Sequence, residues 1–276
     1  MEMENYLRFP GFLVKACTLS YDDGVKDDAR LADIMRKYGL KGTFNINSKN
    51  IVAKNDRCLS VEELNAAYGD DFEIALHGYN HLSLAKVSQT LALRDVVSDR
   101  EYLEKTFGRV VRGMAYANGS FNDEVIELLR MSGVAYSRTT HATHSFDLPE
   151  NWLALDPTCH HVDPELFALV DKFLEPENLA RQWSTKPKLF YLWGHSYEFP
   201  RDNNWEVIEK FGEIMSKRDD VWHATNIEIY KYVEAFKRLV FSLDLSYVEN
   251  PSAIDVYLFV FGKHVVAKAG ETTYLK

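Results

Sequence analysis

Short segments with the character of β-strands alternate with helical segments along most of the chain, and this alternation restricts the fold more than any other feature. Segments rich in β-branched and aromatic residues are predicted to be strands: 12–21, 42–47, 72–76, 113–117, 134–139, 152–156, 189–193 and 221–225. Amphipathic patterns predict helices at 27–38, 61–68, 89–107, 123–131, 164–183 (as one helix or two), 205–217 and 227–239.

Repetition of a strand and a helix about eight times predicts an α/β protein with a (β/α) barrel of seven or eight strands. An open, doubly wound sheet would give the same alternation and is the alternative. The pattern changes after Leu239, where three further strands without helices are predicted: 241–247, 254–261 and 263–269. We therefore predict a barrel domain at 1–239 and a small antiparallel β extension at 240–276, which caps the barrel or mediates self-association.

Charge and cysteine content restrict the partners and the compartment. The net charge of -9 disfavours nucleic acid and anionic membranes as partners. The three cysteines, Cys17, Cys58 and Cys159, suggest neither a disulfide framework nor a zinc finger. The apolar segment 12–19 is interrupted by Lys15, unlike a secretory signal, and no segment reaches the ~20 apolar residues of a membrane span. We expect a cytoplasmic protein.

Polar side chains gather after the predicted strands, at the end where barrel enzymes carry their active sites. They are Asp22 and Asp23, His77 and His81, Asn118, His141 and His144, His160 and His161, and His195. A lone histidine is more often a surface or core residue than a ligand. Seven of the nine histidines, however, fall on this one predicted face.

The spacing of His77 and His81 suggests a metal site, because residues four apart on a helical turn face the same side. Two imidazoles and one carboxylate, from Asp22 or Asp23, would leave open positions for water and substrate. Neighbouring residues on a strand point in different directions, so one aspartate could bind metal while the other faces the water. An ordinary turn with a helix cap is the alternative for Asp22-Asp23-Gly24.

These motifs resemble the polysaccharide deacetylase family, the NodB homology domain of the carbohydrate esterase type, over roughly residues 12–239. Ser20-Tyr21-Asp22-Asp23-Gly24 is similar to Thr-Phe-Asp-Asp-Gly, and His77 to His81 matches His-x-x-x-His. The resemblance implies a distorted barrel in which Asp22 is the general base. It also implies that Asp23, His77 and His81 bind a divalent metal. Zinc suits this ligand set best, although Co²⁺, Ni²⁺ or Fe²⁺ would tolerate it.

The third family motif, Arg-x-Pro-x-Gly, is matched only in outline by residues 115–119. Ala115 replaces the arginine that orients the base in the family, and Arg112 or Arg138 is the candidate to substitute for it. The resemblance implies that the backbone N–H of Asn118 stabilises the oxyanion, a role that does not depend on the side chain.

The fifth motif, Leu-x-His, is similar to Leu192-Trp193-Gly194-His195 with one extra residue, which makes His195 the candidate general acid. Trp193 is a candidate wall of the acetyl pocket, with barrel packing as the alternative. The fourth motif has no clear counterpart, although Asp156, Thr158, His160 and His161 lie in the right region. Candidate substrate contacts are Tyr116, Trp193, His160 and His161.

The resulting hypothesis is a metal-dependent hydrolase that removes N-acetyl or O-acetyl groups from a small amino sugar or oligosaccharide. It would act on carbon–nitrogen bonds other than peptide bonds, either as a single chain or as a homo-oligomer. One alternative is hydrolysis of a cyclic imide or ureide at the same metal site. Another is a catalytically silent barrel that binds carbohydrate through aromatic side chains.

Overall fold

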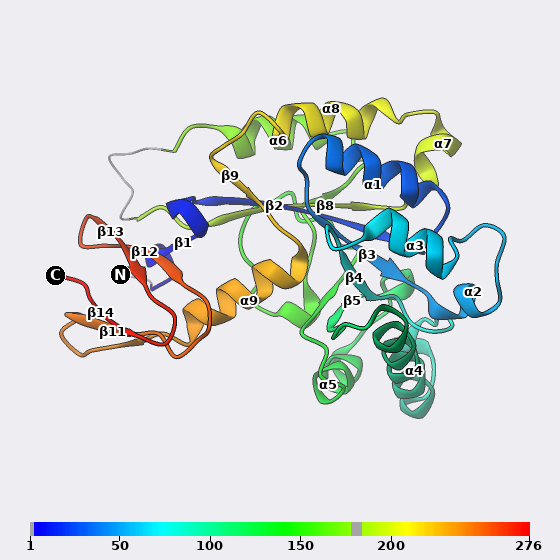
Figure 1. The fold of residues 1–276 in the computed structure, drawn as a ribbon, viewed down its shortest axis with the longest axis horizontal. Coiled ribbons are helices and arrows are strands. Elements are labelled where there is room, and N and C mark those ends of the chain that lie inside the picture. Colours follow the sequence, from blue (N-terminus) through cyan, green and yellow to red (C-terminus); the bar gives the residue numbers. More distant parts are fainter. Residues whose placement is uncertain (1–2, 178–183) are drawn as a thin grey trace.

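A single parallel sheet dominates the computed structural model, which describes residues 3–177 and 184–276. Its strands are β2 (Lys15–Asp22), β3 (Gly42–Ile46), β4 (Glu73–Leu76), β5 (Gly113–Ala115), β6 (Tyr136–Arg138), β7 (Cys159–His160), β8 (Lys188–Gly194) and β9 (Val221–His223). The strand order is β6-β5-β4-β3-β2-β8-β7, and β9 pairs with the beginning of β2. Parallel pairing brings the carboxyl ends of the strands to one face of the molecule (Figure 1).

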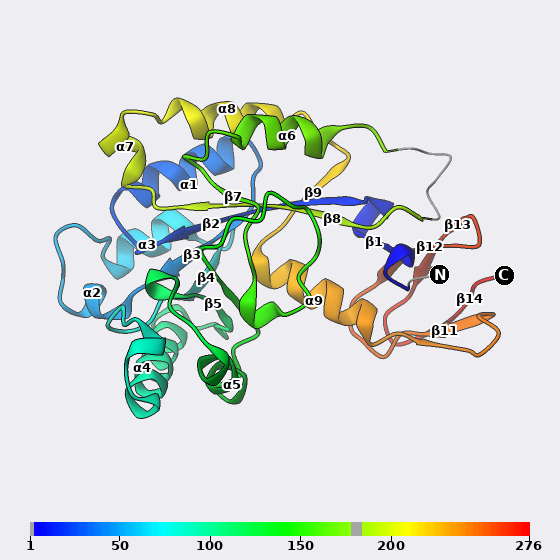
Figure 2. The same ribbon diagram turned by 180° about the vertical axis from the view of Figure 1, so that it is seen from behind.

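Helices connect these strands and cover the sheet. They are α1 (Asp27–Lys37), α2 (Ser48–Val52), α3 (Val61–Tyr68), α4 (Gln89–Phe107), α5 (Asp123–Met131), α6 (Leu166–Leu174), α7 (Glu198–Asp202), α8 (Glu206–Met215) and α9 (Asn226–Lys237). Figures 1 and 2 show α1, α6 and α8 together on one side of β2 and β8, with α9 on the other side. Reciprocal capping boxes begin two of these helices, Ser60 with Glu63 at α3 and Thr225 with Glu228 at α9.

The segment that follows β6 closes the sheet into a distorted half-barrel. Leu155 exchanges backbone hydrogen bonds with Ser137 and Thr139 at 3.0 and 2.9 Å. A few residues later the same segment pairs with β8, where the Thr158 N–H donates to the Tyr191 carbonyl at 2.9 Å. The predicted (β/α) barrel is therefore confirmed, and the open doubly wound sheet is excluded.

The predicted alternation agrees with the structure except in a few segments. The strand predicted at 152–156 is wrong, because Trp152–Ala154 forms a 3₁₀ turn that the Asn151 side chain caps. The strand of this region is β7, slightly later in the chain. The five-residue helices α2 and α7 are too short for a periodic pattern to reveal. The predicted helix at 164–183 corresponds to α6, and 178–183 lie outside the described residues.

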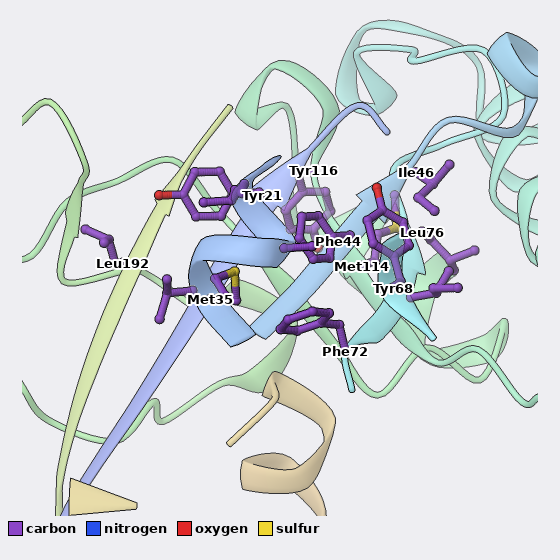
Figure 3. Close-up of a cluster of buried hydrophobic side chains, with 14 of the residues drawn as sticks. Tyr21, Met35, Phe44, Ile46, Tyr68, Phe72, Leu76, Met114, Tyr116 and Leu192 are labelled. Atoms are coloured by element: carbon purple, nitrogen blue, oxygen red, sulfur yellow. The ribbon is translucent and has the colours of Figure 1, made fainter. Parts of the chain in front are cut away.

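Aromatic and aliphatic side chains of β2, β3 and β4 pack beneath α1 and α3 (Figure 3). The Phe44 ring stacks on Tyr68 at 4.1 Å and meets Phe72 edge-on at 5.5 Å. A Cβ atom at Gly42 would lie 2.7 Å from both the Leu19 carbonyl oxygen and the Met35 Cε. Strand β3 therefore needs glycine at its first residue so that α1, which carries Met35, can pack closely against it.

A buried polar network fills the barrel near the start of α9. Glu73 accepts hydrogen bonds from the Thr43 hydroxyl at 2.8 Å, the Tyr136 hydroxyl at 2.8 Å and the Ile227 N–H at 2.9 Å. The last of these donors is an N–H in the first turn of α9, where the helix dipole favours an acceptor. The carboxyl group of Glu73 thus joins three strands, β3, β4 and β6, to one helix, α9.

Asn226, the first residue of α9, extends this network toward β2 and β8. Its side-chain oxygen accepts from Thr18 at 2.8 Å, and its amide donates to the Tyr191 hydroxyl at 2.6 Å. These bonds satisfy polar groups that would otherwise be buried without partners. They fix the beginning of α9 against the interior of the barrel.

The C-terminal region forms two small antiparallel sheets. Its strands are β10 (Val240–Phe241), β11 (Tyr247–Glu249), β12 (Val256–Val260), β13 (Lys263–Ala267) and β14 (Thr272–Tyr274). The predicted hairpin around Gly262 is present, with Val260 opposite Lys263. Strand β1 (Leu7–Arg8) pairs with β12, so the N-terminal segment shares a sheet with this region. Figures 1 and 2 place these sheets at the end of the molecule where β2 begins.

Among the described residues, no helix is both long enough and apolar enough to cross a bilayer.

The buried Glu73 carboxyl predicts a pH-dependent stability. Burial raises its pKa from 4.5 to about 7, against the opposing effect of its hydrogen bonds. The folded protein therefore retains a proton that the unfolded chain releases, and the free energy of unfolding falls as the pH rises through this window. The shift corresponds to a penalty on the order of 3 kcal/mol for the ionised form.

We expect Glu73→Gln to reduce this pH dependence, because the amide cannot ionise. Urea unfolding at about pH 5 and about pH 8 would measure the change in the free energy of unfolding. Burial also raises the pKa of Asp28 and Asp99 to about 7, so these two carboxyl groups would still make the free energy of unfolding depend on pH in the variant. Glu62→Gln, at an exposed position of α3, is the control and should behave as the wild type. An unchanged pH dependence in Glu73→Gln would contradict the assignment.

Candidate active site

The two aspartates at the end of β2 point in different directions. Asp22 is the last residue of the strand, opposite Asn45 of β3, and its side chain is buried. At Asp23 the backbone turns left-handed, with φ of 85°, and its N–H donates to the Asn45 carbonyl at 2.9 Å. Asp23 consequently presents its carboxylate to the partly open surface beside the buried Asp22.

The histidine pair lies on a loop after β4 and not on the helical turn that we considered. Gly78 and His81 both adopt positive φ, at 79° and 57°. The loop nevertheless brings the rings of His77 and His81 to a centroid distance of 4.9 Å. The i, i+4 spacing therefore identified neighbouring imidazoles, although through a different backbone conformation.

Two buried carboxylates of α4 hold this histidine loop. Asp99 accepts from the His77 N–H at 3.1 Å and from the Ser48 N–H at 3.0 Å. One turn earlier, Asp95 accepts from the backbone and side-chain nitrogens of Asn80, both at 2.8 Å. Neither aspartate was predicted from the sequence. Their i, i+4 spacing on a helix marks a shared face but does not show what that face contacts.

The donor atoms of Asp23, His77 and His81 fit a divalent cation. The His77 Nδ1 lies 2.9 Å from the Ala115 carbonyl oxygen, so this nitrogen carries the hydrogen and leaves Nε2 free to bind metal. Both histidine Nε2 atoms lie 3.7 Å from Asp23 Oδ1. Ligand atoms ~2.1 Å from one tetrahedral ion are themselves about 3.4 Å apart, which is close to these spacings.

Asp22 is held as a carboxylate by its neighbours. Its Oδ1 accepts from the Asn45 amide at 2.9 Å, and its Oδ2 contacts an Arg138 guanidinium nitrogen. Burial opposes ionisation, but Arg138, His77 and His195 together keep the pKa of Asp22 below its usual range. An ionised carboxylate in this position can accept a proton.

Arg138, and not Arg112, is the arginine beside Asp22. Its guanidinium is fully buried, donates to the Thr139 carbonyl at 3.1 Å and lies 4.1 Å over the Trp193 ring. Arg112 instead donates to the Gly133 carbonyl at 3.0 Å. Arg138 is the last residue of β6, so the site receives its arginine from the strand next to the one that carries Ala115.

His195 follows β8 and lies between two carboxylates. Its Nε2 is 3.9 Å from Asp22 Oδ2, and its Nδ1 is 3.5 Å from Glu198 Oε2. Burial lowers the pKa of His195, but Glu198 and both active-site aspartates outweigh it and raise the pKa above the usual value. Glu198 was not predicted from the sequence, where its position three residues after His195 was the available signal.

The predicted substrate contacts fall into different environments. Tyr116 is buried, stacks on Phe121 at 4.8 Å and donates its hydroxyl to the Leu153 carbonyl at 2.7 Å. It is a packing residue, which corrects the prediction. His161 is also buried, whereas His160 retains some exposure and meets the Trp193 ring edge-on at 4.5 Å.

The other predicted residues make contacts outside the Asp23, His77 and His81 group. His141 pairs with Asp156 at 3.2 Å, and His144 pairs with Asp163 at 2.8 Å. Asn118 lies in the turn after β5 with φ of 57°, and its side-chain amide donates to Ser83 at 3.2 Å. Its position after β5 is compatible with the predicted N–H role, which stays a prediction.

A cavity of about 650 Å³ opens beside Asp23 and His81. Amide and basic side chains line it together with one aromatic ring: Asn47, Asn50, Asn55, Lys26, Arg57 and Tyr197. This volume lies within the usual range for small-molecule sites. Asp23 and His81, which face the cavity, are two of the three proposed metal ligands.

Residues 13–137, which contain Asp22, Asp23, His77 and His81, match the family model described as polysaccharide deacetylase. This part of the chain is similar to the polysaccharide deacetylase family. Curated relatives include the poly-β-1,6-N-acetyl-D-glucosamine N-deacetylases of Staphylococcus epidermidis and Staphylococcus aureus. Each is 25% identical over 162 residues, which cover 54% of this chain and 52% of the relative. The chain thus spans about half the length of these relatives.

Solved structures share the fold of this chain. A Mycobacterium smegmatis structure has a TM-score of 0.58 at 17% identity, covering 84% of this chain and 94% of that one. A CE4 family pseudoenzyme from Bacillus anthracis has a TM-score of 0.53 at 16% identity, covering 82% and 68%. A Streptococcus pyogenes deacetylase in complex with acetate has a TM-score of 0.52 at 18% identity, covering 57% and 69%. These similarities support the barrel fold. A shared fold does not establish an activity, which depends on the residues of the site.

Asp99→Asn is expected to destabilise the loop that carries His77 and His81. The amide nitrogen of the asparagine must face the N–H of either Ser48 or His77, and two donors cannot form a hydrogen bond. The mismatch should lower the free energy of unfolding by about 1–3 kcal/mol. Zinc affinity should fall about tenfold, as for other groups that orient a ligand. Urea unfolding and zinc titration would measure the two effects. Asp171→Asn, at an exposed position of α6, is the matched control, and equal behaviour of both variants would count against the role of Asp99.

Proposed function

We propose that this protein is a metal-dependent deacetylase that hydrolyses the acetyl amide of an amino sugar or a short oligosaccharide. The observation that carries the proposal is the convergence of Asp23, His77 and His81 beside an arginine-bound carboxylate, Asp22. The match of residues 13–137 to the polysaccharide deacetylase family supports the same reaction class. Zinc is the proposed metal, because two imidazoles and a carboxylate suit it.

A cation held by Asp23, His77 and His81 would polarise the acetyl carbonyl and lower the pKa of attacking water. Asp22 accepts the proton of that water, while Arg138 and Asn45 hold its carboxylate in position. The N–H of Asn118 is proposed to stabilise the oxyanion.

His195 protonates the leaving amine, and the raised pKa of this imidazole keeps a proton available. Water adds to the carbonyl carbon and the carbon–nitrogen bond breaks, so the products are acetate and a free amino sugar.

The cavity beside the metal ligands supports a sugar substrate. Asparagine amides can donate to and accept from ring hydroxyls, and the Tyr197 ring offers a surface for stacking on a pyranose. The staphylococcal relatives are named for action on a polymer of N-acetylglucosamine. We propose a small acetylated amino sugar as the substrate here, and we expect the enzyme to act in the cytoplasm.

An acetate-release assay with N-acetylglucosamine oligomers, combined with elemental analysis, tests the proposal. The wild type should release acetate and contain zinc. Asp22→Asn should retain the metal but lose about 10²–10⁴-fold in kcat, because the proton acceptor is removed. Circular dichroism should establish that this variant is folded, since Arg138 also loses its carboxylate partner. His77→Ala should lose the metal of this site and the activity. Ring opening of cyclic amides without acetate release would support the alternative substrate class, and full activity in His77→Ala would reject the metal assignment.

Arg138→Lys should lower kcat at least about tenfold, because lysine cannot contact Asp22, donate to Thr139 and lie flat on Trp193 together. Metal content should stay at the wild-type level, since Arg138 contacts no proposed ligand. Arg112→Lys is the control, because that arginine donates to the Gly133 carbonyl away from Asp22. If both variants lost the same activity, the positioning role of Arg138 would be refuted.

A further inference from the structure

We propose that His160, His161 and Glu198 form a second binding site for a divalent cation, with zinc as the best-suited ion, beside the first metal site. Donor atoms of these three residues lie within 4.8 Å of one another. The proposed deacetylation uses neither His160 nor His161. The binding itself does not depend on that activity.

The spacing of the donor atoms matches a coordination shell. Glu198 Oε2 lies 3.1 Å from His160 Nε2 and 3.4 Å from His161 Nε2. Ligand atoms ~2.1 Å from a tetrahedral zinc ion are about 3.4 Å apart. The Nδ1 of His195 lies 3.5 Å from the same oxygen, so a third nitrogen borders the site. A cation between these atoms would need little movement of the side chains.

The ring nitrogens of His161 are buried and make no hydrogen bonds within the described part of the chain. The side chain is 1% exposed. An unpartnered polar group at this depth is costly unless something else binds it. Coordination of a cation by Nε2 would supply that partner.

Neighbouring residues hold the His161 ring in place. The ring stacks on Phe199 at 4.2 Å and on Tyr21 at 5.7 Å. A Cβ atom at Gly194 would lie 2.0 Å from His161 Nδ1, so only glycine leaves room for the imidazole. The orientation of Nε2 toward Glu198 is therefore fixed by packing before any ion binds.

The second site should bind its cation more weakly than the first. At the first site, the Ala115 carbonyl accepts from His77 Nδ1 and leaves Nε2 free. At the second site, the Val162 N–H donates to His160 Nδ1 at 3.2 Å, which places the ring hydrogen on Nε2. Binding must move that hydrogen and break the Val162 bond. We expect affinity at least about tenfold lower than at the first site.

Zinc titration of the tag-free protein, followed by calorimetry and equilibrium dialysis, tests the proposal. The wild type should bind two equivalents, the second at least about tenfold more weakly. His160→Ala and Glu198→Gln should each bind one equivalent at the tighter affinity. His77→Ala should retain the weaker equivalent. Circular dichroism and thermal unfolding would establish that each variant is folded.

Saturation of the wild type at one equivalent would overturn the proposal. So would a second equivalent that persists in both folded variants, His160→Ala and Glu198→Gln. Cobalt provides an independent readout, because the visible absorption of a second tetrahedral ion should appear in the wild type and not in these variants.

Occupancy of the second site has a consequence that rests on the proposed function. The cation would engage Glu198, which faces the proposed general acid His195. Acetate release should therefore fall as the second equivalent binds, and His160→Ala should no longer show that fall. A rate that stays constant through the second binding step would refute this consequence. Two bound equivalents without any deacetylation would refute the proposed function and leave the second site standing.

Discussion

The buried contact between Arg138 and Asp22 determines how the site is assembled. It joins the carboxyl end of β6 to that of β2, across the strands that lie between them in the sheet order. A buried charge that loses its partner is strongly destabilising, so each side chain requires the other to be in place. The Trp193 ring beneath Arg138 adds β8 to the same assembly. Three strands from distant parts of the chain are thereby fixed around one carboxylate.

Local sequence patterns were sufficient for much of the fold. Hydrophobic periodicity located most strands and helices, because strand and helix periods differ over a few residues. It failed at Trp152–Ala154, where a side-chain cap stabilises a 3₁₀ turn within an apolar segment. The closure of the barrel through Leu155 depends on pairing between distant strands, which no local pattern encodes.

The site could be predicted only where the relevant residues are neighbours in sequence. The spacing of His77 and His81 and the two aspartates at the end of a strand predicted two imidazoles and one carboxylate as ligands. The resemblance to the family then assigned Asp23 as the carboxylate. The choice between Arg138 and Arg112 depended on strand order, which is a property of the folded sheet. Glu198 was missed because its relation to His195 depends on the start of a five-residue helix.

The arrangement of the two ends of the chain has a practical consequence. Strand β1 and the C-terminal strands lie together at the end of the molecule where β2 begins, opposite the strand ends that carry the site (Figure 1). A linker attached near either terminus would leave that face unobstructed. The protein is therefore suited to immobilisation on a solid support, with its cavity directed toward the solution.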